Sequence, residues 1–122
     1  MHEAVRLLGG ATSIEGVRVI VQALEAWDAL GLRAIATSLT SHGRVAAALF
    51  SATQPAAVAV ARSGDVSIDA NAILRTLMAT FGGRGGGKAD LAQGAGLNGD
   101  VAAMIDTTRT VIAAALSLTA TE

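Results

Sequence analysis

The chain has 122 residues, 52% of them hydrophobic, which is enough for one domain with a buried core. Its formal net charge is −1, whereas an independent nucleic-acid-binding domain is usually basic, so any such binding must come from a local patch. The only aromatic residues are Trp27, Phe50 and Phe81, which counts against reading single-stranded nucleic acid by successive base stacking. The absence of cysteine excludes disulfides and thiolate chemistry and fits a cytoplasmic protein.

The sequence gives no sign of a membrane partner. The N-terminus, MHEAVRLLGG, lacks the apolar core of a signal peptide. Residues 45–61 carry no charge, but this stretch is shorter than the roughly 20 residues that a spanning helix needs, and Pro55 lies near its middle. A hairpin of two buried strands fits this stretch better.

Residues 1–15 are predicted to be the end of a linker helix, stopped by Gly9 and Gly10, and a connection. Residues 16–122 are predicted to form the domain. From Gly16, the run GVRVIVQAL alternates around β-branched residues and predicts a strand, with Arg18 and Gln22 on its more exposed face.

The next predicted element is a helix that Asp28 caps and Gly43 ends. Its apolar stripe falls at helical spacing and consists of Leu32, Ile35, Ala36 and Leu39. Two strands are predicted after it, over 44–53 and 56–63, separated by a turn.

Asp69 is predicted to cap a second helix, whose apolar stripe is Leu74, Leu77, Met78 and Phe81. A short edge strand is a further expectation at 91–93. Either Asn98 or Asp100 caps the last helix, whose inward face is predicted to be Val101, Met104, Ile105, Thr108, Ile112, Ala115 and Leu116.

This order of elements predicts a single α/β domain, with a small mixed sheet of about 3–5 strands packed with about three helices. The first two strands are joined by a helix and should be parallel, with a right-handed crossover. The second and third should form an antiparallel hairpin.

The segment Phe81–Gly96, FGGRGGGKADLAQGAG, holds seven of the fourteen glycines and is the most unusual part of the sequence. Consecutive glycines allow positive φ and close backbone approach, so N–H groups can face an anionic or planar partner. Arg84 and Lys88 supply positive charge. A flexible linker is the alternative, but the ordered residue types at 91–93 argue against it.

Phosphate-binding and catalytic motifs do not fit the chain. A P-loop needs Ser or Thr after its lysine, where this chain has Ala89, and a dinucleotide fold would place its glycines after the first strand. His2 and His42 lie in no metal-ligand spacing, and the serines have no identifiable base and orienting acid. We therefore predict no catalytic residues, no metal and no cofactor.

The run GGRGGGKADLAQGAG closely resembles the glycine-rich signature of the DHHA1 family, in the form found in the C-terminal (C-Ala) domain of alanyl-tRNA synthetase. In that form GG-x-GGG is followed by a basic residue, an acidic residue and an AQ-G tail. The order of elements is also similar, so the resemblance covers nearly the whole chain. The matching residues are Gly82, Gly83, Gly85, Gly86, Gly87, Lys88, Asp90, Ala92, Gln93 and Gly94.

The resemblance implies a noncatalytic accessory domain that holds tRNA at the outer corner of its L shape, the elbow, and works with the remaining domains of a synthetase. The glycine-rich loop 82–96 is then expected to face the RNA. Arg44, Arg62 and Arg75 are candidates to extend the patch. The predicted nucleic-acid-binding residues are Gly82, Gly83, Arg84, Gly85, Gly86, Gly87, Lys88 and Gln93.

Two other hypotheses stay open. In DHH-type phosphoesterases the related domain carries GGGH and closes over phosphorylated or nucleotide substrates, whereas this chain has Lys88 in place of the histidine, which favours the synthetase-like form. The third hypothesis is a structural role, in which the last helix or the N-terminal helix makes a homodimer.

Overall fold

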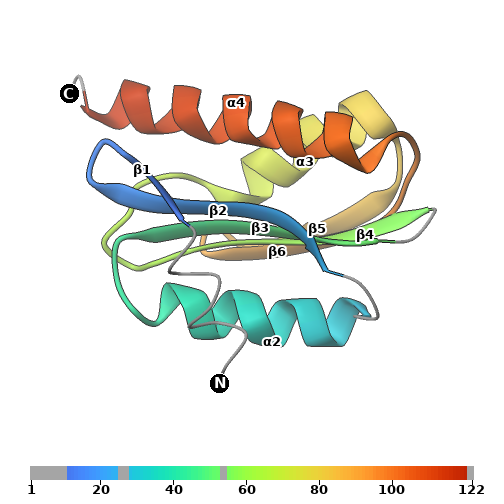
Figure 1. Ribbon diagram of the computed structural model, residues 1–122, viewed down its shortest axis with the longest axis horizontal. Helices are drawn as coiled ribbons and strands as arrows, with labels where there is room; N and C mark the ends of the chain where they lie inside the picture. The colour runs from blue at the N-terminus through green and yellow to red at the C-terminus, as the bar shows by residue number, and fades with distance from the viewer. Residues whose placement is uncertain (1–10, 25–27, 53–54, 121–122) are drawn as a thin grey trace.

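The computed structural model describes residues 11–24, 28–52 and 55–120. These residues form three layers, in which a mixed sheet lies between helix α2 on one face and helices α3 and α4 on the other (Figure 1). The predicted α/β class is confirmed. The predicted linker helix over 1–10 lies outside the described residues.

The sheet has six strands, more than the 3–5 expected, in the order β1-β2-β3-β4-β6-β5. Strands β2 and β3 are parallel and β3 and β4 are antiparallel, as predicted. The additional strands are short or glycine-rich, so they lack the alternation that marks a strand in sequence. The bounds are β1 Thr12–Ile14, β2 Val17–Leu24, β3 Val45–Ser51, β4 Ala56–Arg62, β5 Arg84–Gly87 and β6 Leu91–Leu97.

The core lies on both faces of the sheet because the central strand β3 is buried along its whole length. Side chains alternate between the two faces of a strand, so each half of β3 enters a different apolar cluster. Ala46, Ala48 and Phe50 join the cluster under α3 and α4. Val45, Ala47 and Leu49 join the cluster under α2. The many alanines in these strands let the helices approach closely.

Each of the three described helices begins where a side chain binds the open N–H groups of its first turn. Helix α2 spans Ala29–Thr40, and the Asp28 carboxylate accepts a hydrogen bond from the N–H of Gly31 at 2.8 Å. Helix α3 spans Ala70–Phe81, and Asp69 accepts from Asn71 and Ala72. Both caps are as predicted.

Helix α4 spans Val101–Ala120 and lies across the same face of the sheet as α3 (Figure 1). The Asp100 carboxylate accepts from the N–H of Ala102 at 3.2 Å, so Asp100 is the cap rather than Asn98, whose amide donates to the Gly96 carbonyl. Met104, Thr108, Ile112 and Leu116 are buried on its inner face, as predicted. No described helix is both long and apolar enough to cross a bilayer.

The expectation of a glycine-rich loop over 82–96 is wrong, because most of this segment forms the hairpin of β5 and β6. The expected edge strand at 91–93 is the beginning of β6, which lies between β4 and β5, and β5 is the true edge. Glycine weakens a strand in isolation, so composition alone indicated a loop. Backbone pairing with β6 makes the strand here.

Candidate nucleic-acid interface

Three glycines of the hairpin are explained by the close approach of its two strands. Gly85 pairs with Gly94 across the hairpin, and Gly87 pairs with Ala92. A Cβ at Gly85 would overlap the backbone of Gln93, and one at Gly87 would overlap Leu91. A Cβ at Gly83 would likewise meet the Ala95 carbonyl oxygen. These glycines are therefore required by the fold.

Two more glycines of the segment serve the packing of α3. Gly82 ends the helix with φ +82°, and its N–H donates to the carbonyl of Met78. Gly94 lies beneath α3, where a Cβ would come within 2.9 Å of the Leu74 side chain. A helix can lie close to β6 because this position has no side chain.

Gly86 is different, because the fold places no demand on it. A Cβ at Gly86 would meet no atom within 4 Å, and its φ is not in the positive region where a side chain is strained. Within the described structure, neither a positive φ nor a close neighbouring atom therefore requires glycine at this position. What glycine does provide at Gly86 is bare backbone beside an open hollow.

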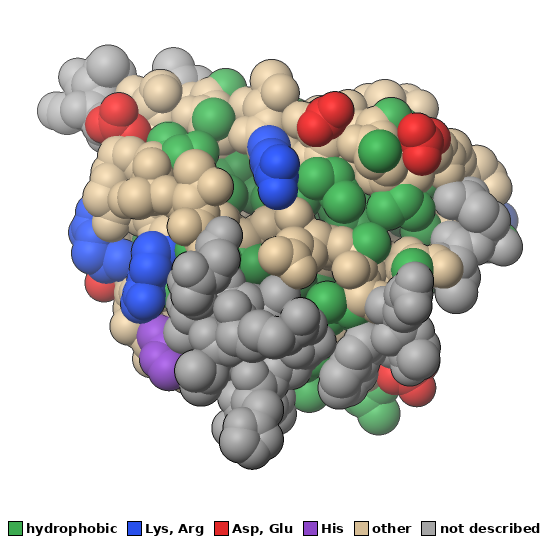
Figure 2. All heavy atoms as spheres, viewed as in Figure 1, with side chains coloured by type: hydrophobic (Ala, Val, Ile, Leu, Met, Phe, Trp, Pro, Cys, Tyr) green, Lys and Arg blue, Asp and Glu red, His purple; other side chains and the backbone are tan. Residues whose placement is uncertain are grey.

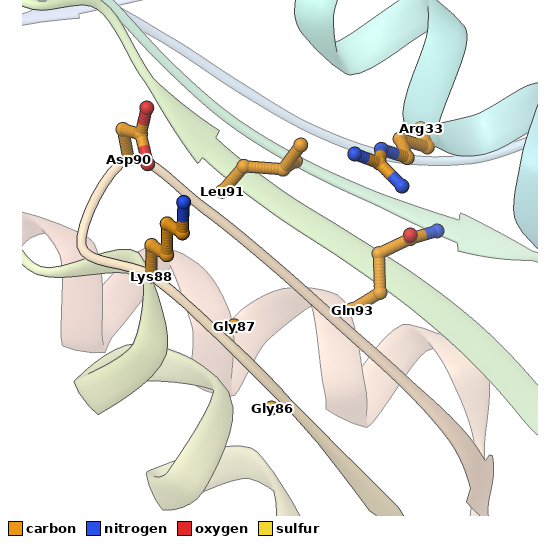
Figure 3. A pocket seen from close by; sticks show the side chains of 7 residues that line it. All are labelled: Arg33, Gly86, Gly87, Lys88, Asp90, Leu91 and Gln93. Atoms are coloured by element: carbon orange, nitrogen blue, oxygen red, sulfur yellow. The ribbon is translucent and has the colours of Figure 1, made fainter.

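The hollow has a volume of about 330 Å³ and lies between α2 and the hairpin (Figure 3). It exists because α2 packs over β3 and β4 and reaches only the near side of β6, whereas β5 packs against α3 on the other face. The described residues therefore leave most of the α2 face of the hairpin uncovered, beyond Leu91. The residues around it are Arg33, Gly86, Gly87, Lys88, Asp90, Leu91 and Gln93.

The turn of the hairpin is held in place by three backbone hydrogen bonds. The N–H of Lys88 donates to the Leu91 carbonyl at 2.9 Å and closes the turn. The carbonyl of Ala89 accepts from Ala70, the first residue of α3, at 2.8 Å, and the carbonyl of Asp90 accepts from Arg62 at the end of β4 at 3.0 Å. The backbone that carries Lys88 and Asp90 is therefore anchored to two neighbouring elements.

Two cations from different elements border the hollow. Arg33 extends from α2 toward Gln93 over β6, while Lys88 and Asp90 stand side by side on the turn (Figure 3). All three charged side chains are exposed. Within the described part of the chain, no hydrogen bond or ion pair occupies the side chains of Arg33, Lys88 or Asp90. No described residue therefore competes with a ligand for these three charges.

The structure brings together four of the eight predicted residues, Gly86, Gly87, Lys88 and Gln93, in this hollow. Gly82 and Gly85 lie outside it. Gly83 and Arg84 border a separate, shallower hollow of about 470 Å³ with Ala95 and Gly96. Arg84 and Lys88 are thus at opposite ends of β5 and do not act on one point.

The three arginines suggested as extensions of the patch do not border the hollow. The Arg44 guanidinium donates from Nε to the Gly16 carbonyl at 2.9 Å, so it holds a turn. Arg62 donates from Nη1 to the Ser63 carbonyl at 3.2 Å. Arg75 lies on α3, on the opposite face of the sheet from α2.

Sequence reasoning missed Arg33, and it also left Asp90 out of the predicted binding residues. Arg33 stands on the polar side of the α2 stripe, where an exposed arginine needs no special explanation. Only the packing of α2 beside β6 brings Arg33 near a segment about sixty residues further along the chain. Among the described residues, no group of three or more His, Cys, Asp or Glu side chains is placed to hold a metal ion.

This glycine-rich hairpin on a mixed sheet belongs to a known class of domain. The family model described as "DHHA1 domain" matches residues 16–114, and the chain belongs to that family. It is similar to parts of alanine–tRNA ligases: it is 42% identical to the enzyme of Methanoculleus marisnigri over 83 residues and 38% identical to that of Thermus thermophilus over 93. These matches cover 68% and 74% of this chain but only 9% and 10% of the ligases.

Two solved structures share the fold. The C-Ala domain of Aquifex aeolicus alanyl-tRNA synthetase superimposes with a TM-score of 0.76 at 21% identity, covering 88% of this chain and 97% of that domain. RecJ of Thermus thermophilus superimposes with a TM-score of 0.68 at 17% identity, covering 95% of this chain and 17% of RecJ. The fold is therefore shared by the C-Ala domain and by part of RecJ, while the relatives with 38–42% identity are ligases.

Proposed function

We propose that this domain is a tRNA-binding accessory part of an alanyl-tRNA synthetase or an editing relative, and that it contacts RNA through the hollow of Arg33, Gly86, Lys88 and Gln93. One observation carries the proposal. Two cations that have no partner among the described residues, one from α2 and one from the hairpin turn, border bare glycine backbone. The similarity to alanine–tRNA ligases supports tRNA-Ala as the RNA in this proposal.

The chemistry of the hollow suits a sugar–phosphate backbone. Arg33 and Lys88 can donate to phosphate oxygens, and charge-assisted hydrogen bonds of this kind are short and strong. Folded RNA is recognised mainly by shape and by phosphate and hydroxyl contacts. Gly86 leaves room for the sugar to approach the strand. On the resemblance to C-Ala domains, the contact is at the tRNA elbow, and catalysis belongs to other domains of a cytoplasmic synthetase.

The proposal is tested by titrating the chain with tRNA-Ala in a gel-shift assay. The double variant Arg33→Ala/Lys88→Ala removes both cations of the hollow, and we expect at least a tenfold weaker affinity, since each charged contact contributes about 1 kcal/mol or more. Arg75→Ala removes one exposed charge from the far face of the sheet and is the matched control. Equal affinity of the double variant and the unchanged chain would refute the contact.

Lys88 offers an independent readout because it is the only lysine in the chain. Reductive methylation followed by mass spectrometry therefore reports on its side chain alone, apart from the N-terminal amine. We expect bound tRNA-Ala to protect Lys88 from methylation. Undiminished labelling at saturating RNA would place the RNA elsewhere on the molecule.

The phosphoesterase alternative rests on the same hollow, because two cations also suit the phosphate of a small nucleotide. A mononucleotide that displaces tRNA-Ala at micromolar concentration, together with a DHH motif in the same reading frame, would favour that function. Self-association remains a separate prediction, and sedimentation of the chain at high concentration measures it.

A further inference from the structure

Asp90 is the unexpected member of the hollow. A carboxylate beside a phosphate-binding site repels the anion that Arg33 and Lys88 attract, so on charge alone it weakens the site. No contact among the described residues requires this side chain, because there it is the backbone carbonyl of Asp90 that accepts a hydrogen bond, from the N–H of Arg62 at 3.0 Å. The side chain itself has no partner among the described residues.

The carboxylate of Asp90 has a use if the ligand carries a hydroxyl donor next to its anionic group. An ionised carboxylate only accepts hydrogen bonds, whereas arginine and lysine only donate them. Two cationic donors and one anionic acceptor around one hollow therefore match a phosphate next to a hydroxyl. In RNA the phosphate and the ribose 2′-hydroxyl are such a pair, and that hydroxyl distinguishes RNA from DNA.

We propose that the hollow is a ribose-phosphate site, in which Arg33 and Lys88 donate to a phosphate and the Asp90 carboxylate accepts a hydrogen bond from the neighbouring 2′-hydroxyl. This inference rests on the proposed RNA-binding function and adds a reason for the site to select RNA over DNA. Gly86 and Gly87 border the same hollow without a side chain, so the sugar can come close to the turn. The three backbone hydrogen bonds of the turn fix where Asp90 stands.

The competing explanation is that Asp90 only balances the charge of Lys88. The two explanations differ in what happens when the hydroxyl is removed from the RNA. A charge-balancing carboxylate is indifferent to the 2′ position, whereas an acceptor loses its hydrogen bond. A cycle that changes the protein and the RNA separately and together isolates this pairwise contribution.

The experiment measures the affinity of the full chain and of Asp90→Ala for tRNA-Ala transcripts. One transcript is unmodified, one carries 2′-fluoro pyrimidines and one carries 2′-fluoro purines, so the two modified transcripts together replace every ribose. Fluorine is close to hydroxyl in size and cannot donate. Any change in RNA folding affects both proteins alike and cancels in the comparison.

For the unchanged chain we expect about a tenfold loss of affinity with one of the fluorinated transcripts, as for a hydrogen bond to a charged group. For Asp90→Ala the loss should shrink to less than twofold. Asp90→Lys is the second variant: its added positive charge should tighten binding to all transcripts while the discrimination still disappears. Equal losses in all three proteins would overturn the inference.

The outcome is separable from failure of the proposed function. If the unchanged chain binds none of the transcripts, the RNA-binding proposal itself fails. If binding is present and Arg33→Ala/Lys88→Ala weakens it, but Asp90→Ala keeps the same fluoro penalty, RNA binding stands and only the ribose contact is refuted.

Discussion

Adjacent glycines of β5 differ in what they do, and substitutions can separate their roles. Gly85→Ala places a methyl group against the backbone of Gln93, and only a shift of β5 relieves the overlap. We expect a loss of about 1–3 kcal/mol in the free energy of unfolding. Urea unfolding followed by circular dichroism measures it. An unchanged midpoint would mean that the hairpin is looser than the structure describes.

Gly86→Ala should give the opposite pattern. Its methyl group enters open space, so we expect the unfolding midpoint to stay within the error of the measurement. The same methyl group reduces the room beside Lys88, so the affinity for tRNA-Ala should fall several-fold. Gly64→Ala is the matched control, because a Cβ there also meets nothing within 4 Å and Gly64 lies outside the hollow.

A stability loss in Gly86→Ala as large as in Gly85→Ala would give Gly86 a structural role instead. Binding that is unaffected would remove Gly86 from the site.

The sequence alone does not distinguish these glycines, because it shows their number and spacing but not which of them lies too close to a neighbouring strand to carry a side chain. Lys88 and Gln93 were predicted for the same site, and Arg33 was not, because its place depends on packing.

At the scale of the element, the N-terminus of α3 supports the hairpin turn. Asp69 accepts hydrogen bonds from Asn71 and Ala72, while the neighbouring N–H of Ala70 donates to the Ala89 carbonyl. Asp69→Ala should lower the free energy of unfolding by about 1 kcal/mol. Asp69→Ser, which keeps a capping oxygen, should restore most of it. Thermal unfolding of the three proteins gives the comparison, and equal melting temperatures would contradict the cap.

The helices and the central strands were predictable because their apolar residues recur at clear helical or strand spacing. Buried residues of α2 and α3 recur at helical spacing after an aspartate cap, and β2 is rich in β-branched residues. The hairpin was not predictable in this way, since RGGG has no side-chain alternation and owes its conformation to pairing with β6. Strand β1 was missed because three residues are too few to show a period.

At the scale of the whole molecule, the hollow follows from unequal coverage of the sheet. Two described helices pack on one face, whereas among the described helices only α2 packs on the other, where it reaches just the near side of β6 (Figure 1). The sequence predicted the number of helices and the mixed sheet, but not which face each helix covers. Because α2 and α3 lie on opposite faces of the sheet, Arg33 borders the hollow whereas Arg75 does not.

The charges of the chain do not form one large basic field. In the view of Figure 2, basic side chains gather at the left edge, whereas acidic side chains lie mainly along the upper edge, over α4. The full chain has 9 Lys and Arg against 10 Asp and Glu, so long-range attraction to an anion is weak. Binding must therefore come from a few short-range contacts, which has a consequence for its salt dependence.

Each phosphate contact contributes about 0.7 to 0.9 to the slope of log affinity against log salt concentration. With Arg33 and Lys88 as the two contacts, the slope for tRNA-Ala should be about −1.4 to −1.8, far shallower than for a basic RNA-binding domain. Lys88→Ala should reduce it by about 1, whereas Arg75→Ala should leave it unchanged. Titrations at four salt concentrations give the slopes. A steep slope that Lys88→Ala does not alter would assign the binding to a diffuse field of charge and remove the hollow from the mechanism.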